Sequence, residues 1–482
     1  MIVGPLDLAI LGLYLIVTAA FGAWIGKGRR SAAQFMLGDR ALPGWLVLAS
    51  IVATETSTVT FLSIPGAAWK GNCTWIQLPI GYAVGRIVVI LVLLPRYFRG
   101  EVVTAYQILH ERFGGLTKLV ASLLFVVTRT LADGLRLFLS AIVLQEIAQI
   151  PMAWAVVAMG LITIAYTWAG GMTAVVWTDF VQLVVYLGGA LLALTILLGR
   201  IDGGLEGLLD AAGPAGKLVA FDFGFDPTNP YQFVTGLVGG AVLSVATHGV
   251  DQIMVQRYLG AKNRAHASWA LGLSGLVVIA QFALFLLIGV ALWKFYEDSG
   301  RSFTKPDRVF ASFIVEELPT PALGIVLGAV FSAAMSTLSS SLNSLSTAFA
   351  NDFWFPRVRP RAGERERFRT VRALIVVFGL LQIAVGIAGQ DLPSSVVDSV
   401  LSIAGFTTGI VLGVFLLGVA TRRVDERAAL VGLLVGAAVV STCAFLTALA
   451  WPWYALVGAS TTFATGCLVA AFTTRSRPGS AS

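Results

Sequence analysis

Residues 49–62 read ASIVATETSTVTFL, a polar insertion within a long apolar run. Six of the seven side chains at 54–60 carry a hydroxyl or carboxyl group. Threonine is β-branched and weakens a helix, and a helix break exposes oxygen atoms that can bind a ligand. We therefore predict a broken helix at this point. A continuous Ser/Thr-rich helix packed tightly on a neighbour is the alternative, and Glu55 fits that alternative poorly.

Apolar character extends over the rest of the chain. Of the 482 residues, 57% are hydrophobic and 12% are charged, against about 25% charged in a soluble domain. This composition excludes a water-soluble globule. The three cysteines form no CxxC pair and there are only three histidines, so the sequence predicts neither a disulfide framework nor a zinc or iron-sulfur site. No cofactor is expected.

Apolar runs of about 20 residues predict an all-α polytopic membrane protein with thirteen spans. The first run starts without a basic segment and is long enough to cross a bilayer, so we expect a span there and not a cleavable signal peptide. The longest connection has only some thirty residues, which predicts one transmembrane domain over 1–482 and no appended enzyme domain. The predicted spans are 6–26, 43–68, 75–98, 116–149, 151–169, 174–199, 231–257, 266–293, 319–350, 371–390, 394–418, 427–449 and 451–472.

The basic residues indicate how the chain is oriented. An odd number of spans places the termini on opposite sides. Alternate connections on the side of the C-terminus carry 23 of the 33 Lys and Arg residues, against seven on the other side. The positive-inside rule then predicts a cell-membrane protein with its N-terminus outside and its C-terminus in the cytoplasm. The net charge reflects topology and not nucleic-acid binding, and the arginine-rich stretch 357–372 is expected to face anionic lipid.

A second polar interruption falls in span 7, where residues 244–252 read SVATHGVDQ. Gly249 offers a place for the helix to unwind, and His248 and Asp251 lie three residues apart. His248 either contacts a substrate or gate, or is a satisfied structural histidine. Asp251 either lines the same site or reaches the membrane interface.

Spans 6 and 9 also carry polar groups. Asp179 lies nearly two turns into span 6 with no Lys or Arg in the same span, so it is protonated, bonded to another span, or bound to a cation. Small-residue packing explains part of the polar face of span 9, but its length favours an ion or solute path. That face carries Ser332, Ser336, Ser339, Ser340, Asn343 and Thr347 at helical spacing.

Span 4 brings three charged residues onto one helix face, namely Arg129, Asp133 and Arg136. This face has a net positive charge. One interpretation is an internal ion-pair ladder. The other is that Arg136 is left in excess and binds a substrate carboxylate.

The two interrupted helices occupy matched positions. Leaving out span 1, spans 2–6 (43–199) and spans 7–11 (231–418) form two groups of five, and each group opens with its broken helix. Because five is odd, the second group must be inverted. Two broken helices in inverted repeats are typical of a transporter with its binding site at the membrane midplane. The two helices at 427–472 follow the repeats.

At this point the sequence resembles the sodium:solute symporter family, which includes sodium-coupled glucose, iodide, proline and sialic acid transporters. The resemblance covers nearly the whole chain. It implies the leucine-transporter fold with one extra helix before the repeats, and sodium-driven alternating access. Its marks are residues 53–57 with Phe61, residues 63–66, the 166–179 segment with Gly170, Gly171 and Asp179, residues 247–257, and residues 336–344.

The resemblance also implies two sodium sites. Sodium site one would use backbone carbonyls of Ala53, Thr56 and Ala333 and hydroxyls of Ser336 and Thr337. Sodium site two would use Asp179, Ser339 and Ser340, and it implies two Na⁺ per cycle.

The substrate is less well indicated. Glucose carriers have an amide on span 11, but residues 401–408 read LSIAGFTT, so a neutral sugar or polyol is the less favoured alternative. Sialic acid carriers hold the carboxylate with an arginine on span 4. We expect a small carboxylate or zwitterion. The residues expected to line its cavity are Glu55, Ser57, Thr60, Gln77, Arg136, His248 and Asp251.

Two other function classes stay open from the sequence. A channel would need a continuous hydrated pore, and a transporter-like sensor would carry an appended signalling domain. The partners expected are a small-molecule solute, Na⁺ and membrane lipid, and no nucleic acid.

Overall fold

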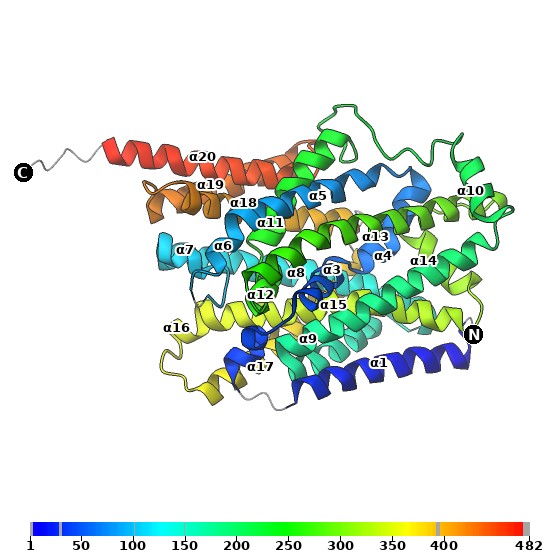
Figure 1. Cartoon of the computed structure of the whole chain (residues 1–482), viewed down its shortest axis with the longest axis horizontal. Helices are drawn as coiled ribbons and strands as arrows, with labels where there is room; N and C mark the ends of the chain where they lie inside the picture. The colour runs from blue at the N-terminus through cyan, green and yellow to red at the C-terminus, as the bar shows by residue number, and fades with distance from the viewer. Residues whose placement is uncertain (1–2, 28–30, 101, 149, 392–395, 476–482) are drawn as a thin grey trace, which may run out of the picture.

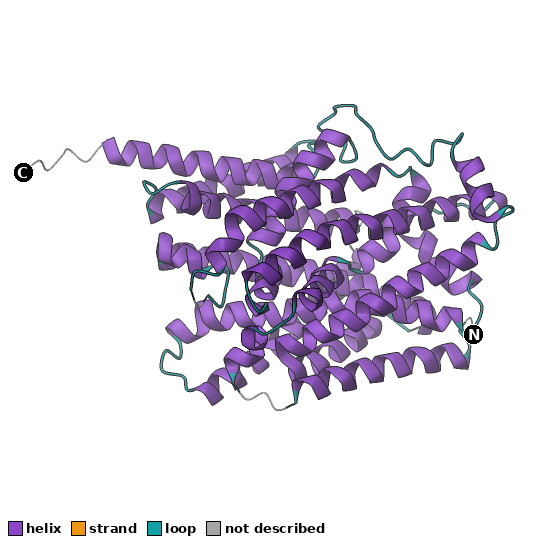
Figure 2. Ribbon diagram, in the orientation of Figure 1, coloured by secondary structure: helices purple, strands orange, loops and turns teal. Residues whose placement is uncertain are grey.

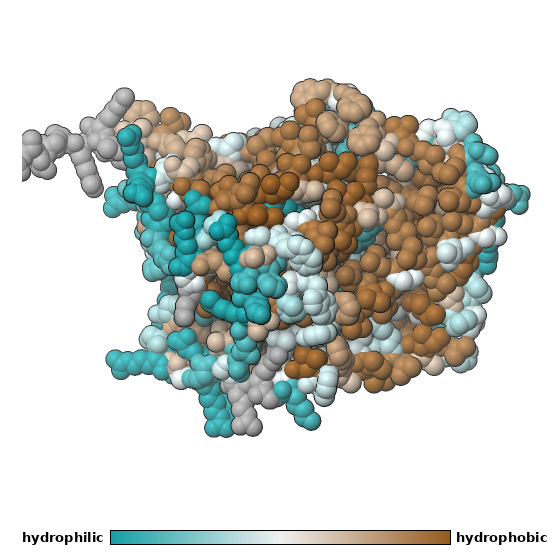
Figure 3. All heavy atoms as spheres, viewed as in Figure 1, coloured by the Kyte–Doolittle hydropathy of each residue, from teal (hydrophilic) through white to brown (hydrophobic). Residues whose placement is uncertain are grey.

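The computed structural model describes residues 3–27, 31–100, 102–148, 150–391 and 396–475. Within these ranges the chain is helical apart from turns and one isolated β-bridge (Figure 2). The long helices run side by side along the length of the molecule, and the beginning of the first helix and the end of the last helix lie at opposite ends (Figure 1). A broad hydrophobic surface separates two hydrophilic ends on the face drawn in Figure 3. These features confirm the predicted all-α polytopic membrane fold.

The helices follow the predicted order. They are α1 (Pro5–Gly26), α2 (Ala32–Leu37), α3 (Gly44–Glu55), α4 (Thr58–Lys70), α5 (Gln77–Val88), α6 (Leu94–Tyr97), α7 (Gln107–Arg112), α8 (Gly115–Ala148), α9 (Met152–Leu198), α10 (Gly204–Ala212), α11 (Gly240–Gly249), α12 (Gln252–Gly260), α13 (Arg264–Asp298), α14 (Asp307–Glu317), α15 (Ala322–Phe349), α16 (Phe355–Arg357), α17 (Glu364–Ala388), α18 (Val396–Ala420), α19 (Glu426–Leu446) and α20 (Trp453–Arg475).

In the part of the chain that is described, nine helices are long and apolar enough to cross a membrane, or up to eleven if each of two bent pairs is one span. The 47-residue helix α9 covers predicted spans 5 and 6 and has one non-helical residue, Gly171, at φ +63°. Tyr166 and Thr178, on either side of Gly171, both lie next to Gly22 of α1. The two arms of α9 therefore fold back at Gly171. The total of thirteen spans stays a prediction.

Both predicted helix breaks are present. Helices α3 and α4 meet at 57° across Thr56 and Ser57, and the segment containing α11 meets α12 at 58° across Val250 and Asp251. A β-bridge joins Leu42, before α3, to Ala261, after α12. The beginning of the first broken helix therefore lies beside the end of the second, as inversion of the two repeats requires.

Helix α15 lies at the centre of the bundle. Of its most apolar 18-residue window, 94% is buried, a larger share than in any other candidate span described. It packs against both α8 and α9, with α1 covering it from outside, whereas α18, α19 and α20 pack on one another at one side (Figure 1). The polar face predicted on span 9 is therefore buried inside the protein and does not face lipid.

Candidate functional site

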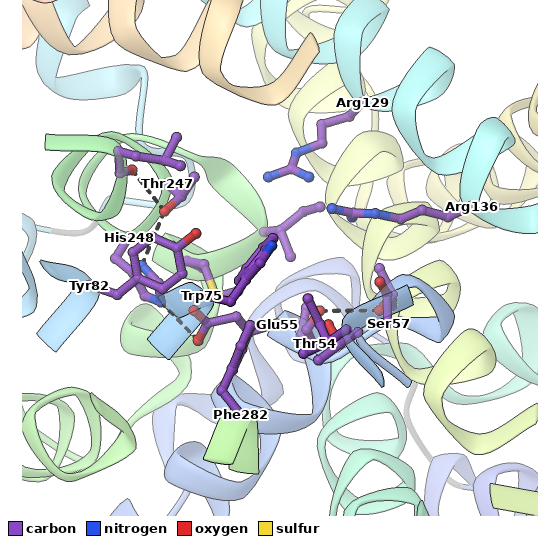
Figure 4. A pocket seen from close by; sticks show the side chains of 16 residues that line it. Thr54, Glu55, Ser57, Trp75, Tyr82, Arg129, Arg136, Thr247, His248 and Phe282 are labelled. Atoms are coloured by element: carbon purple, nitrogen blue, oxygen red, sulfur yellow. Dashed lines mark hydrogen bonds and ion pairs between the residues drawn. The ribbon is translucent and has the colours of Figure 1, made fainter. Parts of the chain in front are cut away.

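A cavity of about 120 Å³ lies between the two helix breaks (Figure 4). It is lined by residues from α3, α4, α5, α8, α11, α12, α13 and α15, and by Trp75 before α5. Five of the seven predicted substrate residues line it. These are Glu55, Ser57, Thr60, Arg136 and His248.

Glu55 is the last residue of α3, and on one wall of the cavity it lies close to two basic side chains. It forms an ion pair with Arg86 of α5, which is 0% exposed and whose Nη1 donates to Ser274 Oγ at 2.9 Å. His248 Nε2 lies 3.6 Å from Glu55 Oε2 and has no hydrogen-bond partner among the described residues. Arg86 was not among the site residues predicted from the sequence. Its position inside a membrane span was the available signal, because an arginine there needs a carboxylate partner.

Both arginines of α8 point from their helix towards the cavity (Figure 4). Arg129 binds Asp251 at the other helix break through Nε, at 2.7 Å, and through Nη2. Arg136 Nη1 donates to Asp133 at 2.8 Å, and Arg136 Nε has no hydrogen-bond partner among the described residues. The interpretation that Arg136 is left in excess was wrong, because Asp251 from the second repeat pairs with Arg129 and Asp133 pairs with Arg136. The guanidinium of Arg136 nevertheless lines the cavity.

The other two predicted substrate residues do not line this cavity. Gln77 donates from Nε2 to the carbonyls of Tyr231, at 2.8 Å, and Thr74, at 3.0 Å. Its amide is therefore held by the 3-10 turn directly before α5 and by the connection that precedes α11. Asp251 caps α12 by accepting from the amide of Ile253 at 2.9 Å, and its other oxygen binds Arg129. The polar groups of both side chains are therefore bound by hydrogen bonds or ion pairs within the protein.

Aromatic residues that the sequence analysis did not single out close the cavity. Trp75 stacks on Phe282 with ring centroids 5.7 Å apart, and it also contacts Tyr231. A wider hollow of about 890 Å³ lies on the other side of Trp75, under the connection that precedes α11. Trp75 and Ile64 line both spaces, so they form the partition between them. Aromatic residues are hard to assign from the sequence because most membrane spans contain them.

The residues predicted for sodium site one meet where α3 breaks beside α15. The Thr337 hydroxyl lies 3.1 Å from the carbonyl of Thr54 and 3.4 Å from those of Thr56 and Ala333. Ser336 Oγ, one position earlier, is buried without a partner in the described chain. Ala53 is fully buried in the last turn of α3. A cluster of oxygens that includes an unpartnered hydroxyl has the chemistry of a site for a hard cation.

Asp179 is bonded to another span, one of the three states that the sequence left open. Its Oδ2 accepts from Ser50 Oγ at 2.5 Å and lies 3.1 Å from Nη2 of Arg257, a buried residue of α12. The same Nη2 donates to Ser340, so this predicted ligand of sodium site two is bonded to an arginine. Ser339 donates to the carbonyl of Ser336 at 3.2 Å. Arg257 was not predicted as the partner of Asp179, because the two residues lie on different spans.

Only two side chains of the region 401–408 are described. The side chains of 401–406, where a sugar carrier would have its amide, lie outside the described residues. Thr407 and Thr408 line a separate small pocket that also contains Asp251.

Comparisons with known proteins agree with this geometry. The chain is 29% identical to the human sodium/iodide cotransporter over 90% of its own length and 69% of that protein. It is 28% identical to sodium-coupled monocarboxylate transporter 1 of Xenopus laevis, over 90% and 71%. It is 26% identical to the sodium/sialic acid symporter SiaT of Proteus mirabilis, over 97% and 95%.

Solved structures show the same fold. A Na⁺-coupled sialic acid symporter in its substrate-bound outward-open state matches with a TM-score of 0.89, 25% identity, and coverage of 97% of this chain and 98% of that one. The nucleobase-cation symporter Mhp1 in a closed conformation matches with a TM-score of 0.61 at 16% identity, over 93% and 96%. The model of the sodium:solute symporter family matches residues 35–436, and the chain therefore belongs to the sodium:solute symporter family.

Proposed function

We propose that this sodium-coupled symporter imports a small organic carboxylate, which binds in the cavity between the two helix breaks. The observation that carries the proposal is the position of Arg136, whose guanidinium lines the cavity while its Nε has no partner among the described residues. An arginine offers several donors in a planar fork that matches a carboxylate. Glu55, Ser57, Thr60 and His248 line the same space and would contact the rest of the solute.

The relatives support this substrate class. They include monocarboxylate and sialic acid symporters, whose substrates carry a carboxylate group. A zwitterion stays the second candidate, because Glu55 retains 17% side-chain exposure in the cavity and could meet an amino group.

A binding screen of the purified protein tests the proposal. A ligand that binds only the folded state raises the unfolding temperature by mass action. We expect small monocarboxylates to raise it in Na⁺ and to have a much smaller effect in choline. Neutral sugars should have no effect in either salt. A response to sugars alone, or equal responses in the two salts, would contradict the proposal.

Sodium is proposed to bind where α3 breaks beside α15. The proposed ligands are the carbonyls of Ala53, Thr56 and Ala333 and the hydroxyls of Ser336 and Thr337. One Na⁺ here would connect the first broken helix to α15, so that its binding favours one packing of the two repeats. A second Na⁺ is proposed at Asp179, which would give two Na⁺ per cycle.

Removing one hydroxyl from sodium site one should weaken Na⁺ activation. Ser336→Ala and Thr337→Ala are each expected to cost about 1 to 3 kcal/mol of Na⁺ binding, or about 5- to 150-fold in the Na⁺ concentration for half-maximal uptake. Ser346→Ala is the matched control, since among the described residues this α15 hydroxyl bonds only to the carbonyl of Asn343. Uptake measured against Na⁺ concentration gives the answer, and wild-type Na⁺ dependence in both variants would contradict the assignment.

Arg136 should not tolerate lysine. Arg136→Lys keeps the charge but loses the fork that holds a carboxylate by two hydrogen bonds. We expect the substrate KM to rise at least about tenfold, which corresponds to about 1.4 kcal/mol. Arg112→Lys is the control because Arg112 does not line the cavity, and its guanidinium donates to the carbonyls of Thr421 and Val424 in the α18–α19 connection and lies over the Phe113 ring. Arg136→Ala with a normal KM would make Arg136 a structural residue.

The proposed orientation places the N-terminus outside and the C-terminus in the cytoplasm. The end of the molecule at which α20 ends also holds the connection between α16 and α17, which is rich in arginine (Figure 1). The positive-inside rule places such a connection in the cytoplasm, next to anionic lipid.

A further inference from the structure

A buried glutamine one turn beyond Asp179 has no partner. Gln182 on α9 is 0% exposed, and neither its amide nitrogen nor its amide oxygen makes a hydrogen bond within the described chain. Burying an amide without partners is unfavourable, and such groups in native proteins usually bind water or a ligand. The Gln182 amide therefore requires a water or a ligand as its hydrogen-bond partner.

Two oxygens nearby are also without partners. Asp179 uses Oδ2 to bind Arg257 and Ser50, whereas its Oδ1 is buried and has no partner in the described residues. The Ser336 hydroxyl faces the Asp179 carboxylate and is likewise buried without a partner there. Because Asp179 and Gln182 are three residues apart on one helix, their side chains share a face.

The extra helix α1 closes this space on its outer side. The amide of Gln182 lies near the hydroxyls of Tyr14 on α1 and Tyr166 on α9, without good hydrogen-bond geometry to either. The Tyr14 hydroxyl accepts from Ser332 Oγ at 2.5 Å, and Tyr166 donates to the carbonyl of Met335 at 2.7 Å. The space is thus bounded by α1, α9 and α15, and oxygen atoms surround it.

We propose that Gln182 is a ligand of the cation that binds at Asp179. Asp179 Oδ1, Ser336 Oγ and the Gln182 amide oxygen hold the ion, and a set of oxygens with one carboxylate suits a hard cation such as Na⁺. Arg257 keeps Oδ2 and Ser340, so the ion binds without displacing the arginine. This assignment rests on the proposed function. It replaces Ser339 and Ser340 of the predicted set with Gln182 and Ser336, whose hydroxyl oxygen has two lone pairs and is shared with sodium site one.

The test is Gln182→Leu in the purified full-length chain, measured as the unfolding temperature in Na⁺ and in choline. In choline we expect the variant to unfold at or above the wild-type temperature, because an unsatisfied amide has been removed. In Na⁺ the variant should lose much of the wild-type stabilisation, and the Na⁺ concentration for half the effect should rise about tenfold or more. Gln182→Met, which keeps the length of the side chain, should behave in the same way.

Gln382→Leu is the matched control. Gln382 is also a buried glutamine in a membrane helix, but its Nε2 donates to Ser341 Oγ at 2.9 Å. This control should lose stability equally in the two salts and keep its Na⁺ dependence.

Two results would overturn the inference. A wild-type response to Na⁺ in both Gln182 variants would show that the amide is not a ligand of the cation. An equal loss of stability in Na⁺ and choline would show that the Gln182 amide binds an ordered water and not the cation. In either case the proposed function stands as long as the wild-type protein is stabilised by Na⁺, whereas a wild-type protein without any Na⁺ response would overturn the function as well.

Discussion

Glu55→Ala is expected to lower the free energy of unfolding by about 3 to 5 kcal/mol, because it leaves the guanidinium of Arg86 buried without its carboxylate. Arg86 is 0% exposed, and apart from Glu55 its bonded partner is the Ser274 hydroxyl. The effect is read from unfolding in detergent by heat or denaturant.

Two further variants make this prediction specific. Glu317→Ala removes the carboxylate of an ion pair with Arg200 that is 28–39% exposed, and it should cost less than about 1 kcal/mol. The double variant Glu55→Ala with Arg86→Met should recover most of the stability, because no charge is left buried. A Glu55→Ala effect as small as that of the control would show that Arg86 finds another partner.

Asp179→Asn is expected to lower the Hill coefficient for Na⁺ from near two towards one. The carboxylate contributes the only full negative charge to the proposed ion ligands, and an amide cannot replace that charge. The variant should also lose stability, since Arg257 is 1% exposed and keeps only hydroxyl and carbonyl partners among the described residues. Uptake against Na⁺ concentration, together with thermal unfolding, measures both effects.

A double variant separates the two effects. Asp179→Asn with Arg257→Met removes the buried guanidinium and should recover stability, but not the second Na⁺. Asp298→Asn is the control, because the pair that Asp298 forms with Lys294 lies at the surface. A Hill coefficient near one in the wild type and unchanged in Asp179→Asn would contradict a second sodium site at Asp179.

The breaks of the two membrane helices could be predicted from the sequence because their signal is local. Oxygen-bearing side chains in the first break and Gly249 with Asp251 in the second interrupt apolar runs, and the structure ends α3 at Glu55 and α11 at Gly249. The predicted boundary between spans 151–169 and 174–199 likewise falls at Gly171, the one non-helical residue of α9, whereas the total of thirteen spans stays a prediction.

The partners of the buried charges could not be predicted. Asp179 and Arg257 are 78 residues apart, and Arg129 and Asp251 are 122 apart. Each pair joins the two repeats, so its geometry depends on how one repeat packs against the other. Counting the charges of α8 alone therefore gave a net positive charge, which Asp251 of the second repeat neutralises. Gln77 was misplaced for a similar reason, because loops beyond its own helix bind its amide.

Concentrative uptake into proteoliposomes tests the central claim of sodium-driven carboxylate import most directly. Purified protein is reconstituted, and a radiolabelled monocarboxylate from the binding screen is supplied outside with an inward Na⁺ gradient. We predict saturable accumulation above the external concentration, which collapses when choline replaces Na⁺ or when an ionophore dissipates the gradient. Accumulation that is equal in Na⁺ and choline, or entry that never exceeds equilibration across the membrane, would contradict the account.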